Sequence, residues 1–363
     1  MLGLRDLNRA TLARQLLLAP ADLPVTAALT QVAGLQAQLA GPPHIGLWSR
    51  LRGFSRAQLA AAYAAHTVVR APLFRGTLHL VTAADYAEFR AVVAPMLHRS
   101  FAGMDKTRLK GIDPFALADE ARPFLREQPR TQDEVRDFLG AQHPKLDVRM
   151  LGHAVRLHLP LVQVPEPGAG SWDFPAMPRF ALADPWLGRP LGTKTDPAGL
   201  ISRYLAAFGP ASARDFQTWS GFAARETLET LRGTLRVSHD EQGRELFDLP
   251  DAHLPGGDVP APVCFLPEYD NLLLAHADRT RIVADVFRPQ VFLPGLRVAA
   301  TFLVDGFVRG TWKVTRAKQT VTITLTAFAA LSRKERATAI AAAEPLAGFL
   351  EPEATKVAVS FAG

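Results

Sequence analysis

Cysteine is almost absent from the chain. The single cysteine, Cys264, rules out an internal disulfide framework, and its apolar surroundings ("PVCFLP") favour a small buried side chain over a nucleophile. Lysine is also scarce: 8 lysines stand against 33 arginines in 363 residues, with a formal net charge of +6. No apolar run approaches the ~20 residues that a membrane span needs, and the N-terminal segment has no apolar signal core. We therefore expect a cytoplasmic protein, associated with the nucleoid if it binds DNA, and no membrane partner.

The chain also lacks the catalytic and cofactor-binding motifs that can be recognised from the spacing of residues alone. The 10 histidines are scattered, and neither Cys-x-x-Cys nor His-Glu-x-x-His occurs. The stretch 168–173, "GAGSWD", lacks the third glycine of a dinucleotide loop, and the chain has neither a Walker loop nor a Gly-x-Ser-x-Gly elbow. The sequence therefore predicts no metal and no cofactor.

Arginine is what the chain has in excess. Guanidinium groups keep their charge and match phosphate oxygens, so an arginine-rich surface suits nucleic acid. A biased base composition of the coding DNA explains the same excess. Composition therefore leaves the two interpretations open.

The first 95 residues have the pattern of a winged helix. Apolar residues recur at helical spacing over 4–18 and 24–36, and Ser55 is placed to cap a third helix over 55–69. Two short apolar arms over 70–82 flank the turn signal Arg75-Gly76. In such a fold the third helix can enter a DNA groove while the hairpin touches the backbone.

The same order of helices and arms recurs twice. We expect a second winged helix with a Pro/Gly-rich connector over 96–190, where Thr131 and Glu134 form a capping box, and a third over 191–256, where Ser212 caps a helix. Alternating β-runs, a long helix and a last strand predict a small β-barrel or antiparallel sheet over 257–363. The expected fold class is helix-rich α+β, with three tandem winged helices and a C-terminal small β-barrel.

Two glutamines stand one residue apart in "GLQAQLAG" (34–41), between a helical pattern and the helix-breaking "GPPHIG". On a helix Gln36 and Gln38 would diverge by ~200°, whereas in extended backbone they share a face. If both amides serve one purpose, the motif must lie where the helix ends. From these residues alone a solvated helix end is the simpler interpretation.

Three other segments, 47–54, 70–81 and 266–282, are denser in polar groups than packing requires. A structural interpretation competes for several of them: His79 as a hydrogen-bonded residue of the hairpin, Asp270-Asn271 as a turn, and Arg279 and Arg281 as members of a surface ion-pair cluster with Asp278. From these segments we predict DNA contacts by Arg50, Arg70, Arg75, His79, Asp270, Asn271, Arg279 and Arg281.

Taken in order, "LQAQ…LWSRL", "RAPLFRGTLHLV", "GPASARDFQTWSG", "LPEYDNLLLAHADRTRI" and "LVDGFVRGTWKV" resemble the AlkZ-like winged-helix DNA glycosylases, and the resemblance covers nearly the whole chain. It implies three tandem winged helices around a basic concave surface, and a C-terminal β-barrel. The family's catalytic motif is Gln-apolar-Gln in one branch and Gln-apolar-Asp in another. Gln36-Ala37-Gln38 matches the first, so the resemblance implies that Gln36 and Gln38 are catalytic.

The implied activity is that of a monofunctional, monomeric DNA glycosylase acting on bulky or crosslinked N-alkylated purines in duplex DNA. A purine alkylated on a ring nitrogen is cationic and leaves as a neutral base, so no general acid is needed. Gln38 would position the water and Gln36 would orient it or contact the sugar. Two other classes stay open: a winged-helix transcriptional regulator, and a non-catalytic DNA-binding protein.

Overall fold

The hairpin and three helices expected over the first 95 residues are present in the computed structural model, which describes residues 1–104, 106–166 and 172–362. Two details differ: "GPPHIG" ends the preceding segment but begins a further helix at Pro42, and the helix expected over 55–69 ends at Ala64, where a strand soon follows. The expected Ser55 cap is confirmed, because the Ser55 amide donates to Gln58 Oε1 at 2.8 Å in a capping box. The elements here are α1 (Leu4–Arg14), α2 (Val25–Gln31), β1 (Leu35–Gln36), α3 (Pro42–Trp48), α4 (Arg56–Ala64), β2 (Val68–Pro72), a 3-10 turn (Phe74–Gly76) and β3 (Leu78–Thr82).

The next part of the chain joins the first rather than forming a separate core. Its elements are α5 (Ala83–Ala102), α6 (Pro114–Glu127), β4 (Arg130–Thr131), α7 (Gln132–Gln142), α8 (Val148–His158), β5 (Leu161–Gln163), β6 (Arg179–Leu182) and α9 (Ala183–Leu187). The predicted Thr131–Glu134 capping box is confirmed. One six-stranded sheet, ordered β1-β3-β2-β5-β6-β4, runs through both parts, with Arg70 opposite Gln163.

Two expectations for this region need correction. The predicted boundary at residue 95 falls inside the long helix α5, whose apolar face packs into a core shared with later helices. The predicted connector also supplies structure: β6 pairs with both β5 and β4, and α9 follows it. The last three residues of β6 are apolar and buried, in a core that α5, α6 and α8 share, and β6 contacts α6 directly. Residues 167–171 of the connector, including most of "GAGSWD", lie outside the described residues.

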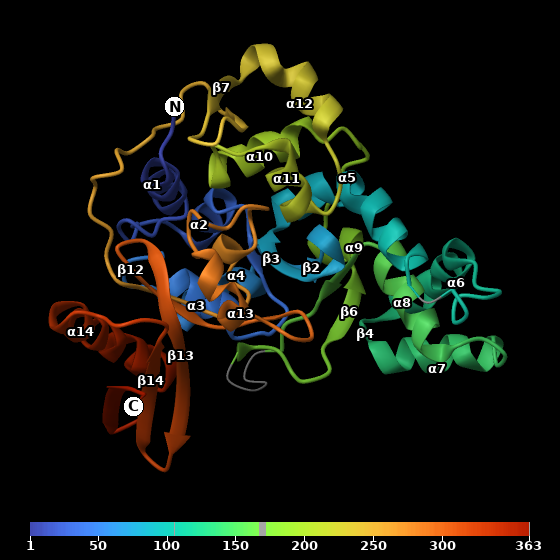
Figure 1. The fold of residues 1–363 in the computed structure, drawn as a ribbon. Coiled ribbons are helices and arrows are strands. Elements are labelled where there is room, and N and C mark those ends of the chain that lie inside the picture. The colour runs from blue at the N-terminus through green and yellow to red at the C-terminus, as the bar shows by residue number, and fades with distance from the viewer. Residues whose placement is uncertain (105, 167–171, 363) are drawn as a thin grey trace.

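The third part consists of α10 (Ala198–Phe208), α11 (Ala213–Ser220), α12 (Arg225–Leu231), a 3-10 turn (Arg232–Thr234) and the hairpin β7 (Arg236–His239) and β8 (Glu245–Asp248). Ser212 caps α11 as predicted, in a box with Asp215. In Figure 1, α10 and α11 lie between α1 and α5, so this part packs against the first.

The C-terminal part forms an open sheet rather than the expected barrel. Its five strands are ordered β15-β14-β13-β12-β9, and the outer two do not pair with each other among the described residues. The pairs are antiparallel except β14–β15, where α14 (Arg333–Leu350) crosses over and covers one face. The strands are β9 (Cys264–Leu266), β12 (Thr301–Val304), β13 (Phe307–Ala317), β14 (Thr320–Ala327) and β15 (Lys356–Phe361).

Between β9 and β12 the chain is irregular, although the sequence predicted alternating β-runs in this part of 257–363. The structure instead has 3-10 turns at Asn271–Leu273 and Asp285–Phe287, the short helix α13 (Arg288–Val291), and a two-stranded pair, β10 (Phe292–Leu293) with β11 (Arg297–Val298). Ile282 and Val283 are apolar because they fill a core with α1 and β12, not because they alternate on a strand.

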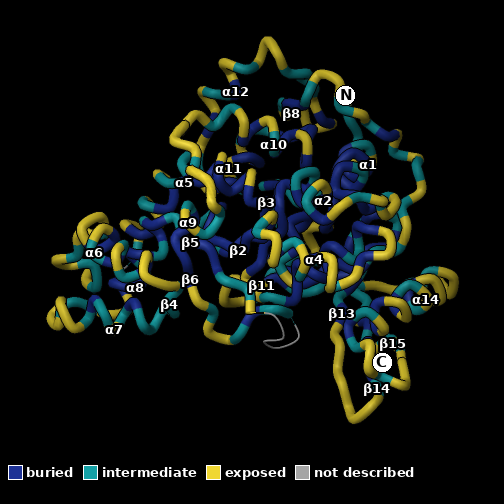
Figure 2. The backbone as a smooth tube through the Cα atoms, turned by 180° about the vertical axis from the view of Figure 1, so that it is seen from behind, coloured by how far each residue is buried: buried dark blue, intermediate teal, exposed yellow. Residues whose placement is uncertain are grey.

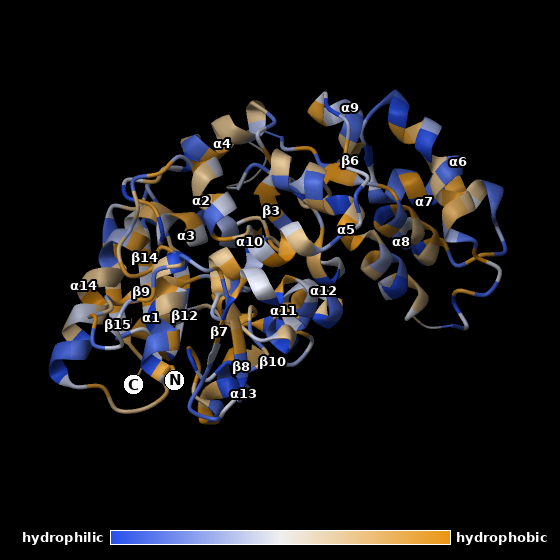
Figure 3. Cartoon of the chain, turned by 90° about the horizontal axis from the view of Figure 1, so that it is seen from above, coloured by the Kyte–Doolittle hydropathy of each residue, from blue (hydrophilic) through white to orange (hydrophobic). Residues whose placement is uncertain are grey.

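Burial is greatest where these parts meet. Figure 2 shows dark, buried backbone around β2, β3 and α1, and exposed backbone on α6, α7 and the β13–β14 hairpin. Figure 3 places α6–α8 at one end of the molecule and α14 with its sheet at the other. Within the described residues, none of the helices has the length and apolar character needed to cross a bilayer.

Candidate functional site

The glutamine motif lies on the strand edge that follows α2. After α2 the chain reverses through Ala33 and Gly34, both at positive φ, and enters β1. A Cβ at Gly34 would lie 2.5 Å from Val81 Cγ1, so only glycine fits here. Gln36 pairs with His79 on β3, and the Ala37 amide donates to the Leu78 carbonyl at 2.7 Å. The first half of the motif is thus extended, and the chain bends at Gln38 after the strand ends.

A buried polar cluster from the C-terminal part holds the backbone that leads into the motif. Asn271 Nδ2 donates to the carbonyls of Val32 (3.1 Å) and Gly34 (2.9 Å). Both carboxylate oxygens of Asp270 accept from the Arg50 guanidinium, at 2.8 and 2.9 Å, and both side chains are fully buried. These three residues were predicted to contact DNA. That prediction is wrong for this conformation, because their polar atoms are engaged inside the protein.

Arg70 holds the backbone of the motif itself. Its Nε donates to the Ala37 carbonyl at 2.9 Å and its Nη2 to the Gln38 carbonyl at 3.3 Å. Its Nη1 donates to Gln163 Oε1 at 2.5 Å, and its guanidinium lies 4.9 Å from the Phe174 ring centroid. With 6% of its surface exposed, Arg70 supports the motif from within rather than contacting DNA as predicted.

Arg75 contacts the side chain of the first glutamine. Its Nη2 donates to Gln36 Oε1 at 2.6 Å, and its Nη1 donates to the carbonyl of Trp219, at the C-terminal end of α11. Arg75 and Gly76 both adopt positive φ in the predicted turn. A Cβ at Gly221 would approach the Cα of Arg75 to 3.3 Å, so the glycine after α11 permits this close packing. The first and third parts of the chain therefore meet at Arg75, beside Gln36.

The two glutamines differ in exposure. Gln36 is buried, with 7% of its surface accessible, whereas Gln38 is exposed. Gln38 Oε1 accepts a long hydrogen bond, 3.3 Å, from the Leu78 amide. Ala37 between them is completely buried on the opposite side of the strand. The Gln38 amide is therefore the more accessible of the two.

His79 is a structural residue of the hairpin, as the competing interpretation held. Its ring is buried, packs edge-on against Phe74 with centroids 5.1 Å apart, and has Nδ1 3.0 Å from the Thr77 carbonyl. Burial, and secondly the charge of Arg75, lower the pKa of His79 to about 3. The ring is neutral at physiological pH. Because it is buried, it is not placed to make the predicted DNA contact.

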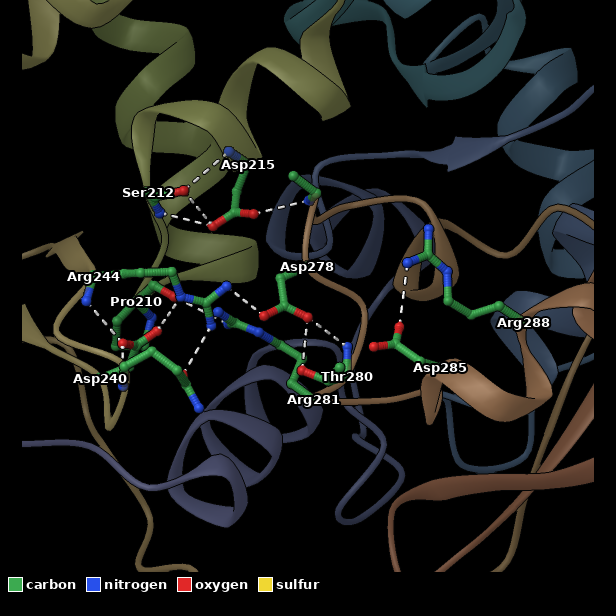
Figure 4. Close-up of polar contacts among 12 residues, drawn as sticks. Pro210, Ser212, Asp215, Asp240, Arg244, Asp278, Thr280, Arg281, Asp285 and Arg288 are labelled. Atoms are coloured by element: carbon green, nitrogen blue, oxygen red, sulfur yellow. Dashed lines mark hydrogen bonds and ion pairs between the residues drawn. The ribbon is translucent and has the colours of Figure 1, made fainter.

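Arg279 and Arg281 have opposite environments, although they are two residues apart. Arg281 is buried and donates to the Pro210 carbonyl at 3.0 Å, as Figure 4 shows. Asp278 pairs with Arg244 instead of joining the predicted ion-pair cluster. Arg279 is half-buried, stacks on Phe292 at 4.1 Å, and has a buried Nε without a partner among the described residues. Burial and, secondly, Arg288 lower the pKa of Arg279.

The sequence therefore missed the supporting residues and misjudged several arginines. Gln163, Trp219 and Phe174 contact Arg70 or Arg75, but they belong to segments with no chemical signature of their own. Of the predicted DNA contacts, Arg75 and Arg279 alone combine partial exposure with a guanidinium that has no carboxylate partner among the described residues. Among the described residues, no group of three or more His, Cys, Asp or Glu residues is arranged to hold a metal.

Comparison with solved structures supports the fold. The structure is similar to that of the Streptomyces sahachiroi DNA glycosylase AlkZ, with a TM-score of 0.80 and 19% sequence identity over 99% of this chain and 100% of that chain. No curated protein matches the sequence significantly. The family model "DNA glycosylase AlkZ-like" matches residues 29–349, which include the glutamine motif, Arg70, Arg75 and the whole of the polar cluster around Asp270. The chain belongs to the AlkZ-like DNA glycosylase family.

Proposed function

We propose that this chain is a monofunctional DNA glycosylase that hydrolyses the N-glycosidic bond of bulky or crosslinked N-alkylated purines in duplex DNA. The observation that carries the proposal is the placement of Gln36 at the end of β1 and of Gln38 in the bend that follows, with the backbone of the motif held by Arg70 and the Gln36 side chain held by Arg75. No carboxylate contacts either glutamine side chain among the described residues. The local chemistry is therefore that of amides and guanidinium groups.

Amides suffice for a cationic leaving group. When C1′–N9 of an N7-alkylated guanosine breaks, both electrons of the bond go to the purine, which leaves neutral. Water then adds to C1′ and releases one proton to solvent. An amide carbonyl accepts a hydrogen bond from that water, and its dipole favours the positive charge that develops on the sugar. The exposed Gln38 is the better placed of the two to bind solvent water.

An exposed glutamine also suits a bulky lesion. A purine crosslinked to the opposite strand cannot rotate into an enclosed pocket without taking that strand along, whereas ordinary flipping costs only a few kcal/mol because the base is free. Gln38 lies at the protein surface, where an adduct that stays in the duplex can be reached. Arg279 is the candidate for phosphate contact, because both amino groups of Arg75 are engaged within the protein, and we propose a monomer as the active species.

The test is release of an alkylated base from a duplex oligonucleotide with a single bulky N7-alkylguanine. Wild-type protein should generate abasic sites that break only after alkali, because a monofunctional enzyme leaves the strand intact. Gln36→Ala and Gln38→Ala should each lower the single-turnover rate by ~10²–10³, the usual loss for one transition-state dipole, with DNA affinity little changed. Sequence-selective binding to undamaged DNA without base release would instead identify a regulator.

A further inference from the structure

We propose that Arg75 is a positioning residue that fixes the orientation of the Gln36 amide, so that Gln36 acts in the reaction as a hydrogen-bond donor through Nε2. This inference rests on the proposed glycosylase function and assigns different roles to the two glutamines. It starts from the contact between Arg75 Nη2 and Gln36 Oε1, 2.6 Å long and largely buried.

The contact fixes which end of the amide faces the site. A guanidinium group has five N–H donors and no acceptor, so the atom of Gln36 that faces Arg75 must be the oxygen. A rotated amide would set its NH₂ group against a cation and lose a charge-assisted hydrogen bond. The structure records no acceptor for Gln36 Nε2 among the described residues. Its N–H groups are therefore available to an oxygen atom of the damaged nucleotide or of the attacking water.

Arg75 is itself held rigidly. Its second amino group donates to the Trp219 carbonyl, and its backbone lies in the turn that packs against Gly221. Its guanidinium has no carboxylate partner among the described residues, so its charge is directed at two neutral carbonyl oxygens. Gln38 lacks such a constraint, since among the described residues its side chain forms one hydrogen bond, the 3.3 Å bond from the Leu78 amide. Gln38 is therefore free to present its carbonyl to a water, and Gln36 is not.

The same substitution at the two positions separates the roles. A glutamate is close to glutamine in size, but at neutral pH its carboxylate only accepts hydrogen bonds. In Gln36→Glu the carboxylate still pairs with Arg75 and has no donor left for the substrate. We expect its single-turnover rate to fall by ~10²–10³, as far as that of Gln36→Ala. Gln38→Glu keeps an acceptor for water, so its rate should fall much less. A Gln36→Glu rate at or above that of Gln38→Glu would overturn the inference.

Arg75→Lys tests the positioning itself, because lysine keeps the charge and loses the planar fork. We expect its single-turnover rate at saturating enzyme to fall on the order of 10-fold to 10²-fold, with DNA affinity and Tm close to wild type. Arg232→Lys, at an exposed arginine paired with Glu229 and Glu245, is the matched control and should leave all three values unchanged. A wild-type rate in Arg75→Lys, or a rate loss explained by a lowered Tm, would overturn the role. A wild-type protein that released no alkylpurine would refute the proposed function itself, and this is measured before any variant.

Discussion

Base release by the wild-type protein should be independent of pH between about 6 and 8.5. Glutamine does not ionise, and the titratable groups next to the motif keep one charge state over this range. The pKa of His79 is lowered to about 3, mainly by burial, so its ring stays neutral. Burial and then Arg279 lower the pKa of Arg75 to about 10, which still leaves it charged up to about pH 9.

The expected size of the effect follows from these pKa values. With a pKa near 3, about 0.1% of His79 is protonated at pH 6, whereas a histidine with the ordinary value of ~6.5 would be about 75% protonated there. If such an ordinary histidine acted as a base, the rate would rise about fourfold between pH 6 and 8.5. For this site the change attributable to His79 is about 0.1%, below what a rate measurement resolves.

The assay is single-turnover release of an N7-alkylguanine at saturating enzyme, so that a pH-dependent DNA affinity does not enter the rate. His79→Ala is measured in parallel to remove the one imidazole of the hairpin. A slope that persists in His79→Ala would reveal a titrating carboxylate and refute the two-glutamine mechanism. Asp270 is a poor candidate for that carboxylate, because both of its oxygens are held by the buried Arg50.

Three further predictions concern stability and binding. His44 and His79 both have pKa values lowered to about 3 by burial, so below pH 6.5 the unfolded chain binds more protons than the folded one. These two groups should lower the free energy of unfolding by ~3 kcal/mol between pH 6.5 and 5, and urea unfolding that showed no such loss would contradict this. Asp270→Ala leaves Arg50 buried without its carboxylate and should lower the free energy of unfolding by ~3–5 kcal/mol in the same assay. Asp278→Ala removes a partly exposed ion pair and should lower it by about 1 kcal/mol or less. Equal losses in the two variants would refute the distinction between buried and exposed pairs. Arg279→Ala should reduce the salt dependence of DNA binding by about one phosphate contact and Arg281→Ala should not, and equal slopes would show that Arg279 makes no phosphate contact.

Local sequence signals predicted the elements well. Ser55, Thr131 and Ser212 begin helices as expected because capping depends on a few neighbouring residues. The turn at Arg75-Gly76 was also predictable from two residues. What these signals could not show is how the parts combine. Pairing of Arg70 with Gln163 joins two predicted domains in one sheet, and it depends on contacts between residues 93 positions apart.

The environments of the arginines were predicted less well, because the sequence does not show whether an arginine faces solvent or a buried carboxylate. Arg50 and Asp270 are 220 positions apart in the chain, so no local pattern could indicate that they pair. Asn271 and Arg281 likewise hold backbone carbonyls from distant segments. The polar density of 266–282 is therefore mostly structural: it fixes the strand edge that presents the glutamines.

The division of arginines between two kinds of partner bears on why amides occupy the motif. Arg50 and Arg14 are buried against carboxylates, at 2.8 and 2.7 Å, so their charges are balanced. Arg70 and Arg75, which contact the motif, donate to neutral carbonyl oxygens and form no ion pair among the described residues. A carboxylate in place of Gln36 would pair with Arg75 and would have no hydrogen-bond donor to offer the substrate. An amide is held in place by the same arginine and keeps its N–H groups free. We expect the phosphates that flank the lesion to supply the missing negative charge when DNA is bound.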